Sequence, residues 1–303
     1  MTTPTVLVVG GDAADAGLAP VVVDLAHRTH TGVLNTWRAK GLFRFDDPAH
    51  LGTIGLQRDD LDLAGVRGAS AGGRRIVLCG VGSGELPVGR SGAMASHAEV
   101  VTPDDLASLE VDDAGVWPPR PALYDGLAAV CGPRYAAVDV PLSPVRAAGD
   151  LAAWLPGGAV VTAGAGVVGF WLGRTFPTRS PGTVVLPSVA DPGFTASVAA
   201  SASGGVVVVC GPEDPLPEVR LPVGSRGRAG AGGAPRRWVV VERWLPDGPA
   251  CTPAVRLANL EAAVAAGGHQ VVEVAVAVDD LAPLEAVAGP VVVWGGPQAN
   301  WSG

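Results

Sequence analysis

Short apolar runs that end in a glycine turn dominate the first third of the chain. Residues 5–9 read Thr-Val-Leu-Val-Val and end at the Gly10-Gly11 turn, and residues 75–79 repeat this form. A β-branched run without polar alternation is typical of a parallel strand that is covered on both faces. The pattern predicts, in chain order, a strand over 5–9, a helix over 18–28, a strand over 32–35, a loop region over 40–55, and strands over 75–79 and 99–101.

The second half of the chain repeats the alternation of apolar runs and helical patterns. Its apolar runs are rich in valine and are bounded by glycine, proline or a helical stretch. Such alternation is what a doubly wound parallel sheet requires. We therefore predict an α/β protein with two doubly wound, mostly parallel, Rossmann-like sheets. The predicted elements here are helices over 146–154 and 253–266, a helical turn over 279–287, and strands over 159–162, 183–186, 206–209, 238–242, 271–276 and 291–294.

A proline-rich tract separates the two patterns. Residues 117–121 read Trp-Pro-Pro-Arg-Pro and residues 141–144 read Pro-Leu-Ser-Pro, with a short helical patch over 124–130 between them. Proline fixes φ and removes a backbone donor, so such a tract cannot continue a sheet or a helix. The predicted organisation is a first domain over 1–111, a connection over 112–145 and a second domain over 146–303.

Composition narrows the class of protein. Of the 303 residues, 48% are hydrophobic and 17% are charged, and this much apolar surface excludes a disordered chain. A formal charge of −8 argues against a nucleic-acid surface. No apolar run reaches the ~18 residues of a membrane helix, and the first residues lack the pattern of a signal peptide. A soluble, cytoplasmic protein without nucleic-acid or membrane partners is expected.

Two segments of the predicted first domain carry a recognisable pattern. Residues 34–43 read Leu-Asn-Thr-Trp-Arg-Ala-Lys-Gly-Leu-Phe, and residues 50–55 read His-Leu-Gly-Thr-Ile-Gly. This signature segment, residues 34–55, resembles part of the central domain of thiamine diphosphate (ThDP) enzymes of the acetolactate synthase and benzoylformate decarboxylase type. Residues 141–162 and 189–202 are similar to the diphosphate-binding domain of the same family. The resemblance implies a central-like domain followed by a diphosphate-binding-like domain.

The resemblance also indicates what this chain lacks. ThDP enzymes of this type have three domains, and their N-terminal pyrimidine-binding domain supplies the glutamate that activates the cofactor. Met1 here matches the start of the central domain, so no counterpart to the pyrimidine-binding domain or its glutamate is expected. The chain alone is then not expected to activate ThDP.

The diphosphate motif of the family is degenerate in this sequence. A Gly-Asp-Gly turn and a later asparagine hold Mg²⁺ in the family, because hard cations of this kind require oxygen ligands. Here the strand over 206–209 is followed by Cys-Gly-Pro-Glu-Asp-Pro, with Pro212 at the position of the metal-binding aspartate. Pro212 and Pro215 also remove two backbone donors from a turn that would otherwise bind phosphate. No metal site is predicted. The degenerate diphosphate site consists of Gly164, Gly166, Gly211, Glu213 and Asp214, of which Glu213 and Asp214 could be displaced ligands.

Three further groups of residues are candidates for chemistry. Gly10 and Gly11, and the Gly-Val-Gly-Ser-Gly run over 80–84, follow strands at the position where α/β sheets bind nucleotides. The signature segment carries charges that could bind an anionic ligand or fix the loop by ion pairs. The histidines could form a metal or acid–base cluster, although His27 is better explained as the end of a helix. The charged residues are Arg38, Lys40, Arg44, Asp46 and Asp47, and the histidines are His27, His30, His50 and His97.

The cysteines and one glycine-rich tract are given no functional role. Cys79, Cys131, Cys210 and Cys251 lie far apart and form no Cys-x-x-Cys pair, so ordinary buried thiols are expected. Residues 226–235 alternate arginine, glycine and alanine, which favours a flexible loop over an RNA-binding segment in an acidic chain.

Three functional hypotheses follow from these observations. The first is a non-catalytic structural or regulatory subunit related to ThDP enzymes. The second is the C-terminal subunit of a split ThDP-dependent 2-oxo acid decarboxylase or carboligase. The third is a sensor that binds a nucleotide through the central-like domain. ThDP and Mg²⁺ are expected only if a partner completes the site, and the expected partner is another copy of the chain or a subunit with the pyrimidine-binding domain.

Overall fold

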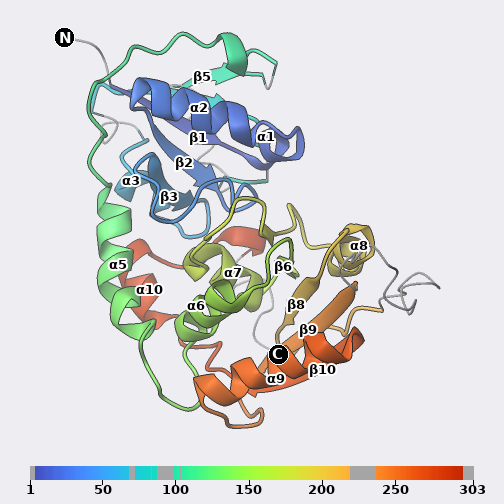
Figure 1. Ribbon diagram of the computed structural model, residues 1–303. Helices are drawn as coiled ribbons and strands as arrows, with labels where there is room; N and C mark the ends of the chain where they lie inside the picture. The colour runs from blue at the N-terminus through green and yellow to red at the C-terminus, as the bar shows by residue number, and fades with distance from the viewer. Residues whose placement is uncertain are drawn as a thin grey trace. The chain divides into compact units, whose positions relative to one another are not determined.

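The computed structural model describes residues 4–67, 72–82, 84–86, 98–102, 104–218 and 237–295. Contacts divide the chain into two units (Figure 1). The first unit contains residues 1–132 and 281–303, and the second unit contains residues 133–280. Each unit is built on a five-stranded sheet in which every pairing between the named strands is parallel, and nine α-helices lie within the described residues. The prediction of an α/β protein with two parallel sheets is confirmed. None of the described helices is long and apolar enough to span a bilayer.

The sheet of the first unit has the strand order β3-β2-β1-β4-β5. β1 pairs in parallel with both β2 and β4, so it lies at the centre. The chain moves outward from β1 to β3 and then crosses to β4 on the other side of β1. This reversal is a topological switch point, where α/β sheets form a crevice at the carboxyl ends of their strands. The strands are β1 (Thr5–Val9), β2 (Gly32–Thr36), β3 (His50–Ile54), β4 (Arg75–Cys79) and β5 (Ala98–Val101).

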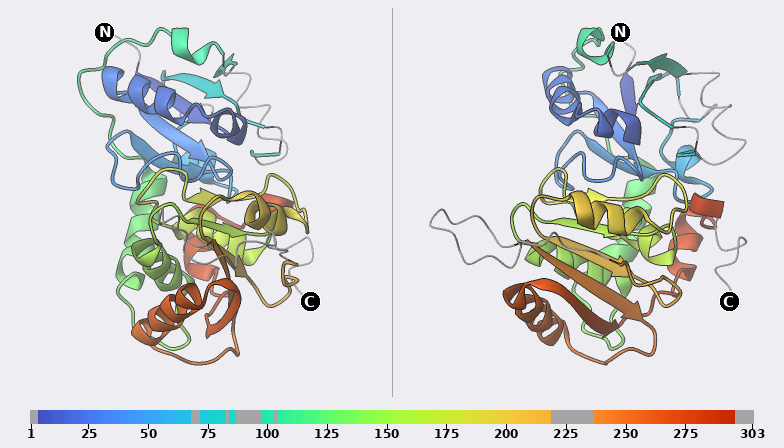
Figure 2. Two further views of the ribbon diagram at one scale, coloured as in Figure 1. Left: turned by 45° about the vertical axis from the view of Figure 1, so that its right-hand side comes forward. Right: turned by 90° about the vertical axis from the view of Figure 1, so that its right-hand side faces the viewer.

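Helices cover both faces of this sheet (Figure 2). Leu7 and Val9 of β1 share a core cluster with residues of α1 (Gly11–Asp15) and α2 (Ala19–Thr29). Val6 and Val8, which point to the opposite face, share a cluster with residues of α3, α5 and α10. Both faces are therefore buried, and this explains why the strand has no polar alternation. The second set of helices is α3 (Asp60–Leu63), α5 (Ala122–Arg134) and α10 (Ala282–Ala288).

The sheet of the second unit has the strand order β10-β9-β8-β6-β7. The chain passes from β6 to the edge strand β7 and returns to β8 on the other side of β6, which creates a second switch point between β6 and β8. α8 packs on the face formed by alternate valines of β8 and β9. α9 packs against β9 and β10, and it also contacts α6, which in turn contacts α7. The elements are α6 (Pro144–Trp154), β6 (Val160–Ala163), α7 (Val167–Thr175), β7 (Val184–Val185), α8 (Phe194–Ser201), β8 (Val206–Cys210), β9 (Trp238–Leu245), α9 (Pro253–Ala266) and β10 (Gly268–Ala275).

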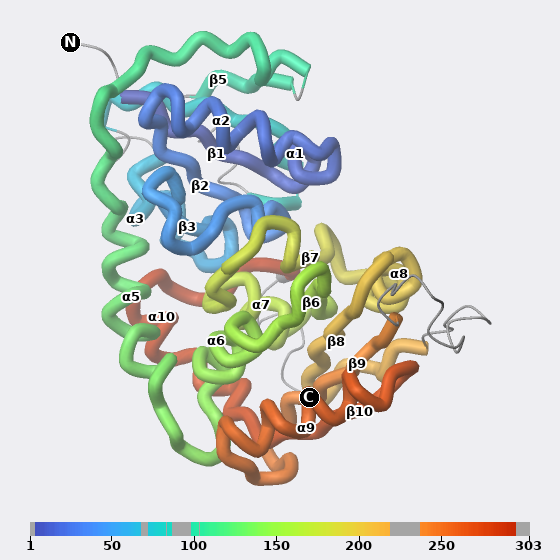
Figure 3. Tube along the Cα trace, viewed as in Figure 1, coloured from blue at the N-terminus to red at the C-terminus, as the bar shows by residue number. Residues whose placement is uncertain are grey.

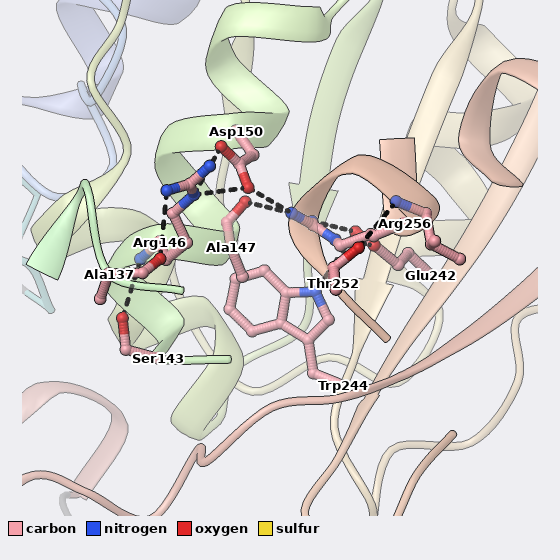
Figure 4. A network of polar contacts seen from close by, with 10 residues as sticks. Ala137, Ser143, Arg146, Ala147, Asp150, Glu242, Trp244, Thr252 and Arg256 are labelled. Atoms are coloured by element: carbon pink, nitrogen blue, oxygen red, sulfur yellow. Dashed lines mark hydrogen bonds and ion pairs between the residues drawn. The ribbon is translucent and has the colours of Figure 1, made fainter. Parts of the chain in front are cut away.

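A buried ion pair joins three of these elements (Figure 4). Arg256 of α9 donates two hydrogen bonds to the Glu242 carboxylate of β9, at 2.6 and 2.8 Å, and neither side chain is exposed. Arg256 also donates to the Ala147 carbonyl of α6 at 2.9 Å, and the Trp244 indole donates to Glu242 at 3.2 Å. A buried charge needs partners of this kind to offset the loss of water.

The end of the chain differs from the sequence prediction. Residues 291–294 were predicted to be a strand of the second domain. Instead, Val291 forms a single antiparallel bridge with Gln57, and residues Val293–Gly295 form a 3-10 turn. The Gln57 side chain donates to the carbonyls of Leu284 and Gly289, at 3.0 and 2.7 Å. These bonds attach the last described residues to the first unit, so the contact-defined boundaries differ from the predicted ranges 1–111 and 146–303.

Two further predictions of local structure need correction. Residues 40–55 were predicted to be a loop region, but they contain the complete strand β3, which pairs with β2. Within the predicted connection 112–145, the helical patch is the longer helix α5.

Candidate functional site

A pocket of about 190 Å³ lies at the switch point of the second unit. The turns that follow β6 and β8 form two of its walls, with Gly164 on one side and Cys210 and Asp214 on the other. The entry to α8 completes it with Asp191 and Thr195. Crevices at the carboxyl ends of parallel strands are the usual ligand sites of such sheets. The pocket is therefore the candidate site of this unit.

Asp214 lies between the two turns of this pocket. One of its oxygens, Oδ2, accepts a hydrogen bond from the Gly211 backbone N–H at 2.6 Å. The other oxygen faces the β6–α7 turn, because Cβ atoms built at Gly164 and Gly166 would lie 4.0 and 3.7 Å from it. Burial raises the pKa of Asp214, as does the negative charge of Glu213, while the bond from Gly211 opposes this shift. A carboxylate of the chain itself thus lies between the two turns.

The five predicted diphosphate residues are brought together only in part. Gly164 and Asp214 line the pocket, and Gly211 and Gly166 are close to the Asp214 carboxylate. Glu213 is exposed and does not line the pocket. Three of the five residues, all glycines, therefore lie around the carboxylate of a fourth, Asp214.

The donors around this pocket do not match a magnesium diphosphate. The Gly211 N–H is already bonded to Asp214, and Pro212 and Pro215 have no N–H to offer. The described lining residues include no lysine or arginine, and their two carboxylates are those of Asp191 and Asp214. The described part of the chain also contains no group of three or more His, Cys, Asp or Glu residues that could hold a metal ion. Mg²⁺ in proteins is usually held by one or two carboxylates together with waters and phosphate oxygens, but Oδ2 of Asp214 already accepts the Gly211 N–H.

Cys210 contributes a neutral thiol to the same pocket. Burial raises its pKa to about 12, with a smaller contribution from the Asp214 charge. A thiol with a pKa this high is protonated at neutral pH and is a weak nucleophile. None of the four cysteines forms a disulfide; Cys79 and Cys131 are buried as predicted, while Cys251 is partly exposed.

A second carboxylate occupies the switch point of the first unit, where a nucleotide turn was predicted at Gly10 and Gly11. The Gly11 N–H lies 3.1 and 2.9 Å from the two oxygens of Glu85, and the Gly82 N–H donates to Oε1 at 3.1 Å. The Thr36 hydroxyl donates to Oε2, and Arg38 Nη1 lies 3.5 Å from Oε1. Glu85 is only 2% exposed. Sequence reasoning did not identify Glu85.

The glycines at this position have a structural explanation that involves no ligand. A Cβ atom at Gly10 would lie 2.2 Å from the Gly80 carbonyl oxygen, so only glycine lets the two turns touch. Gly80 has φ of +60°, and its own Cβ would lie 2.3 Å from the Ala13 nitrogen. Glycine adopts this left-handed conformation without the steric cost of a side chain.

The signature segment forms β2, a buried turn and β3. Asn35 and His50 lie in neighbouring strands, and His50 Nε2 is 2.9 Å from Asn35 Oδ1. The Asn35 amide also donates to Thr53 Oγ1 at 3.1 Å. Burial, together with smaller contributions from the charges of Lys40 and Arg120, lowers the pKa of His50 to about 3. His50 is therefore a neutral hydrogen-bonding residue of the core.

Three of the charged candidates, Arg38, Arg44 and Asp46, form ion pairs within the first unit. Arg38 binds Asp12 at 2.5 Å and also contacts Asp15, and Arg44 binds Asp46 at 2.9 Å. These contacts favour the interpretation that the charges fix the loop.

His27 and His30 each pair with a single carboxylate. His27, in the last turn of α2, lies 3.1 Å from Asp47, and His30 lies 2.8 Å from Asp113. His97 and the tract over 226–235 lie outside the described residues.

Comparisons with known proteins support the fold. No protein-family model and no curated protein matches the sequence. A solved structure from Mycobacterium smegmatis, described as that of a "putative thiamin diphosphate-dependent enzyme", matches with a TM-score of 0.59 over 91% of this chain, at 17% identity. This chain spans 62% of the length of that protein. At this level of identity the match shows that the chain has the fold of that structure.

Proposed function

We propose that the chain is a ThDP-enzyme-like protein that acts as a non-catalytic structural or regulatory subunit. The observation that carries this proposal is the contact between Asp214 and Gly211 in the pocket of the second unit. The backbone donor that would face a diphosphate is satisfied by a carboxylate of the chain itself.

Electrostatics supports the same conclusion. Two like unit charges 4 Å apart repel by about 4 kcal/mol at an effective dielectric constant of ~20. A diphosphate carries several negative charges, and in this pocket it would face Asp191 and Asp214 without a described basic side chain to offset them. Binding would require a cation, and of the two carboxylates that could hold one, Asp214 already accepts the Gly211 N–H.

The alternative proposal is the C-terminal subunit of a split decarboxylase or carboligase. The position of the pocket favours it, because the switch point between β6 and β8 is where a sheet of this kind binds a ligand. Asp191 and Asp214 would then be incomplete ligands that a partner chain supplements. The partner would be a subunit with the pyrimidine-binding domain, whereas a non-catalytic subunit would assemble with other copies of itself or with such a subunit.

Calorimetry with ThDP and Mg²⁺ tests both proposals. The purified chain is expected to give no binding heat when the ligand concentration is 100 times a Kd of ~1 µM. An active ThDP enzyme in the same buffer is the positive control. Micromolar binding by the chain alone would overturn the first proposal. Turnover of a 2-oxo acid that depends on a co-purified pyrimidine-domain chain, and that is lost in Asp214→Ala, would favour the second.

A nucleotide-binding role for the first unit has less support. The crevice that would receive the phosphates contains the Glu85 carboxylate, and the Gly11 and Gly82 N–H groups already donate to it. Mass spectrometry of small molecules released from the purified protein tests this role, and a stoichiometric nucleotide would establish it.

A further inference from the structure

We propose that the donors around Glu85 form a binding site for a small oxyanion, and that Glu85 is the intrachain ligand that occupies it. The ligand class is a singly charged carboxylate. In the native chain a free carboxylate must therefore compete with Glu85 for the crevice.

The first reason is the number of donors that converge on one carboxylate. Two backbone N–H groups, one hydroxyl and one guanidinium surround the two oxygens of Glu85. A carboxylate offers about four lone-pair sites, so its acceptor capacity is filled. Charge-assisted bonds of this kind are the stronger class of hydrogen bond. The arrangement has the composition of an anion site.

The second reason is that the fold brings these donors to one edge of the sheet. Gly11 follows β1, Gly82 follows β4 and Thr36 ends β2, so three adjacent parallel strands present them at one edge of the sheet. The two turns are fixed to each other by backbone bonds, from Gly10 N–H to Cys79 O at 2.9 Å and from Asp12 N–H to Gly80 O at 3.0 Å. These bonds and the pairing of β1 with β2 do not involve the Glu85 carboxylate, so its removal would leave the Gly11 and Thr36 donors in place.

The third reason is the local charge, which selects a monoanion. Arg38 is the one cation among the described donors to Glu85, and it also binds Asp12 and Asp15. An added dianion such as phosphate would face these two carboxylates with more negative charge than Glu85 carries. A monocarboxylate restores the native charge, so it is the ligand that the site should prefer.

Chemical rescue of Glu85→Ala by acetate tests the proposal. The variant is expected to melt below the native protein, and sodium acetate should raise its Tm by about 2–5 °C in a saturable manner, because a ligand that binds only the folded state stabilises it. Sodium chloride at equal ionic strength should have no such effect, and inorganic phosphate should have a smaller one. Acetate should also leave the native protein unchanged, since Glu85 already fills the site.

Two control variants make the result specific. Glu99→Ala removes an exposed carboxylate that pairs with Arg75, and acetate should not rescue it. The double variant Glu85→Ala/Thr36→Val lacks the hydroxyl donor and should lose at least half of the acetate effect. Equal acetate effects in all three variants, or no effect in Glu85→Ala, would overturn the proposal. Stronger binding of phosphate than of acetate would overturn the assignment of a monoanion.

A refolding measurement and a second variant cover the case in which Glu85→Ala does not fold. Glu85→Ala is refolded in 0 and 100 mM acetate and followed by circular dichroism, and it should recover the folded state only with acetate. Glu85→Gln keeps the shape of the side chain and removes its charge, and it should melt below the native protein. A Glu85→Gln variant as stable as the native protein would contradict the proposal, because the donors would then have no preference for an anion.

Discussion

At the scale of single residues, two acidic side chains decide what the candidate crevices contain. Glu85 accepts the N–H of Gly82, three residues earlier, and Asp214 accepts the N–H of Gly211, also three residues earlier. Both strands end in a cysteine that a glycine follows; Gly211 directly follows β8, whereas Gly82 lies three residues after the last residue of β4. A carboxylate three residues after such a glycine was visible in the sequence. The glycine turns alone indicated ligand binding, and these carboxylates change that interpretation.

His50 should make the first unit sensitive to acid. Its pKa of about 3 in the folded protein lies below the usual 6.5, so the unfolded chain takes up a proton that the folded chain does not. The stabilising contribution is present above pH 6.5 and is lost as the pH falls from 6.5 towards 3, by about 1.4 kcal/mol per pH unit. Urea denaturation at pH 7, 6 and 5 measures this slope. It should be smaller in His50→Gln, whereas the exposed His269→Gln should retain the native slope; equal slopes in all three proteins would contradict the prediction.

At the scale of secondary-structure elements, apolar runs predicted the central strands and the long helices. β1, β4 and β8 lie where their valine-rich runs indicated, and α9 has the predicted bounds 253–266. β3 was missed because its first residue is a histidine and its third a glycine. His50 is buried because Asn35 of the neighbouring strand binds it, and Gly52 has φ of +126°. A strand whose polar residues find partners on another strand carries no local apolar signal.

The buried pair of Glu242 and Arg256 should dominate the stability of the second unit. Arg256→Met leaves the Glu242 carboxylate buried without its cation, and removing one partner of such a pair costs about 3–5 kcal/mol. Arg243→Met is the matched control, because Arg243 pairs with the exposed Glu273 and such pairs contribute at most about 1 kcal/mol. Chemical denaturation measures both. Adding Glu242→Gln to Arg256→Met should recover part of the loss, and equal losses in the two single variants would show that the burial argument is wrong.

At the scale of the whole molecule, the two units share a plan that the sequence indicated only in part. Each has a parallel sheet whose chain path reverses at a central strand, and each places a carboxylate of its own chain at that reversal. The sequence could not show that α10, the last described α-helix, belongs to the first unit (Figure 3). The contact depends on Gln57 and on the carbonyls of Leu284 and Gly289, which lie 227 and 232 residues further along the chain. Contacts over such separations have no local pattern.

Gln57→Met should loosen the last described helix from the first unit. The substitution keeps the size of the side chain and removes both donors to the carbonyls of Leu284 and Gly289, at a cost of about 1–3 kcal/mol. Hydrogen exchange should then be faster in α10 and unchanged in β8 and β9 of the second unit. Gln270→Met, which removes a partly buried bond to the Gly267 carbonyl, is the control and should leave α10 protected. Protection of α10 equal to that of the native protein would contradict the role given to Gln57.

The occupied crevice of the first unit also links stability to evolvability. A protein that binds a free anion gains that stabilisation only when the anion is present, whereas Glu85 supplies it in every molecule at all times. A chain that acquires such a residue replaces a stabilisation that depends on the ligand with one that is always present. Any later substitution that empties the crevice then lowers the free energy of unfolding. A substitution that ends anion binding in this way is retained more easily than it is reversed, because the folded chain no longer depends on the ligand for its stability.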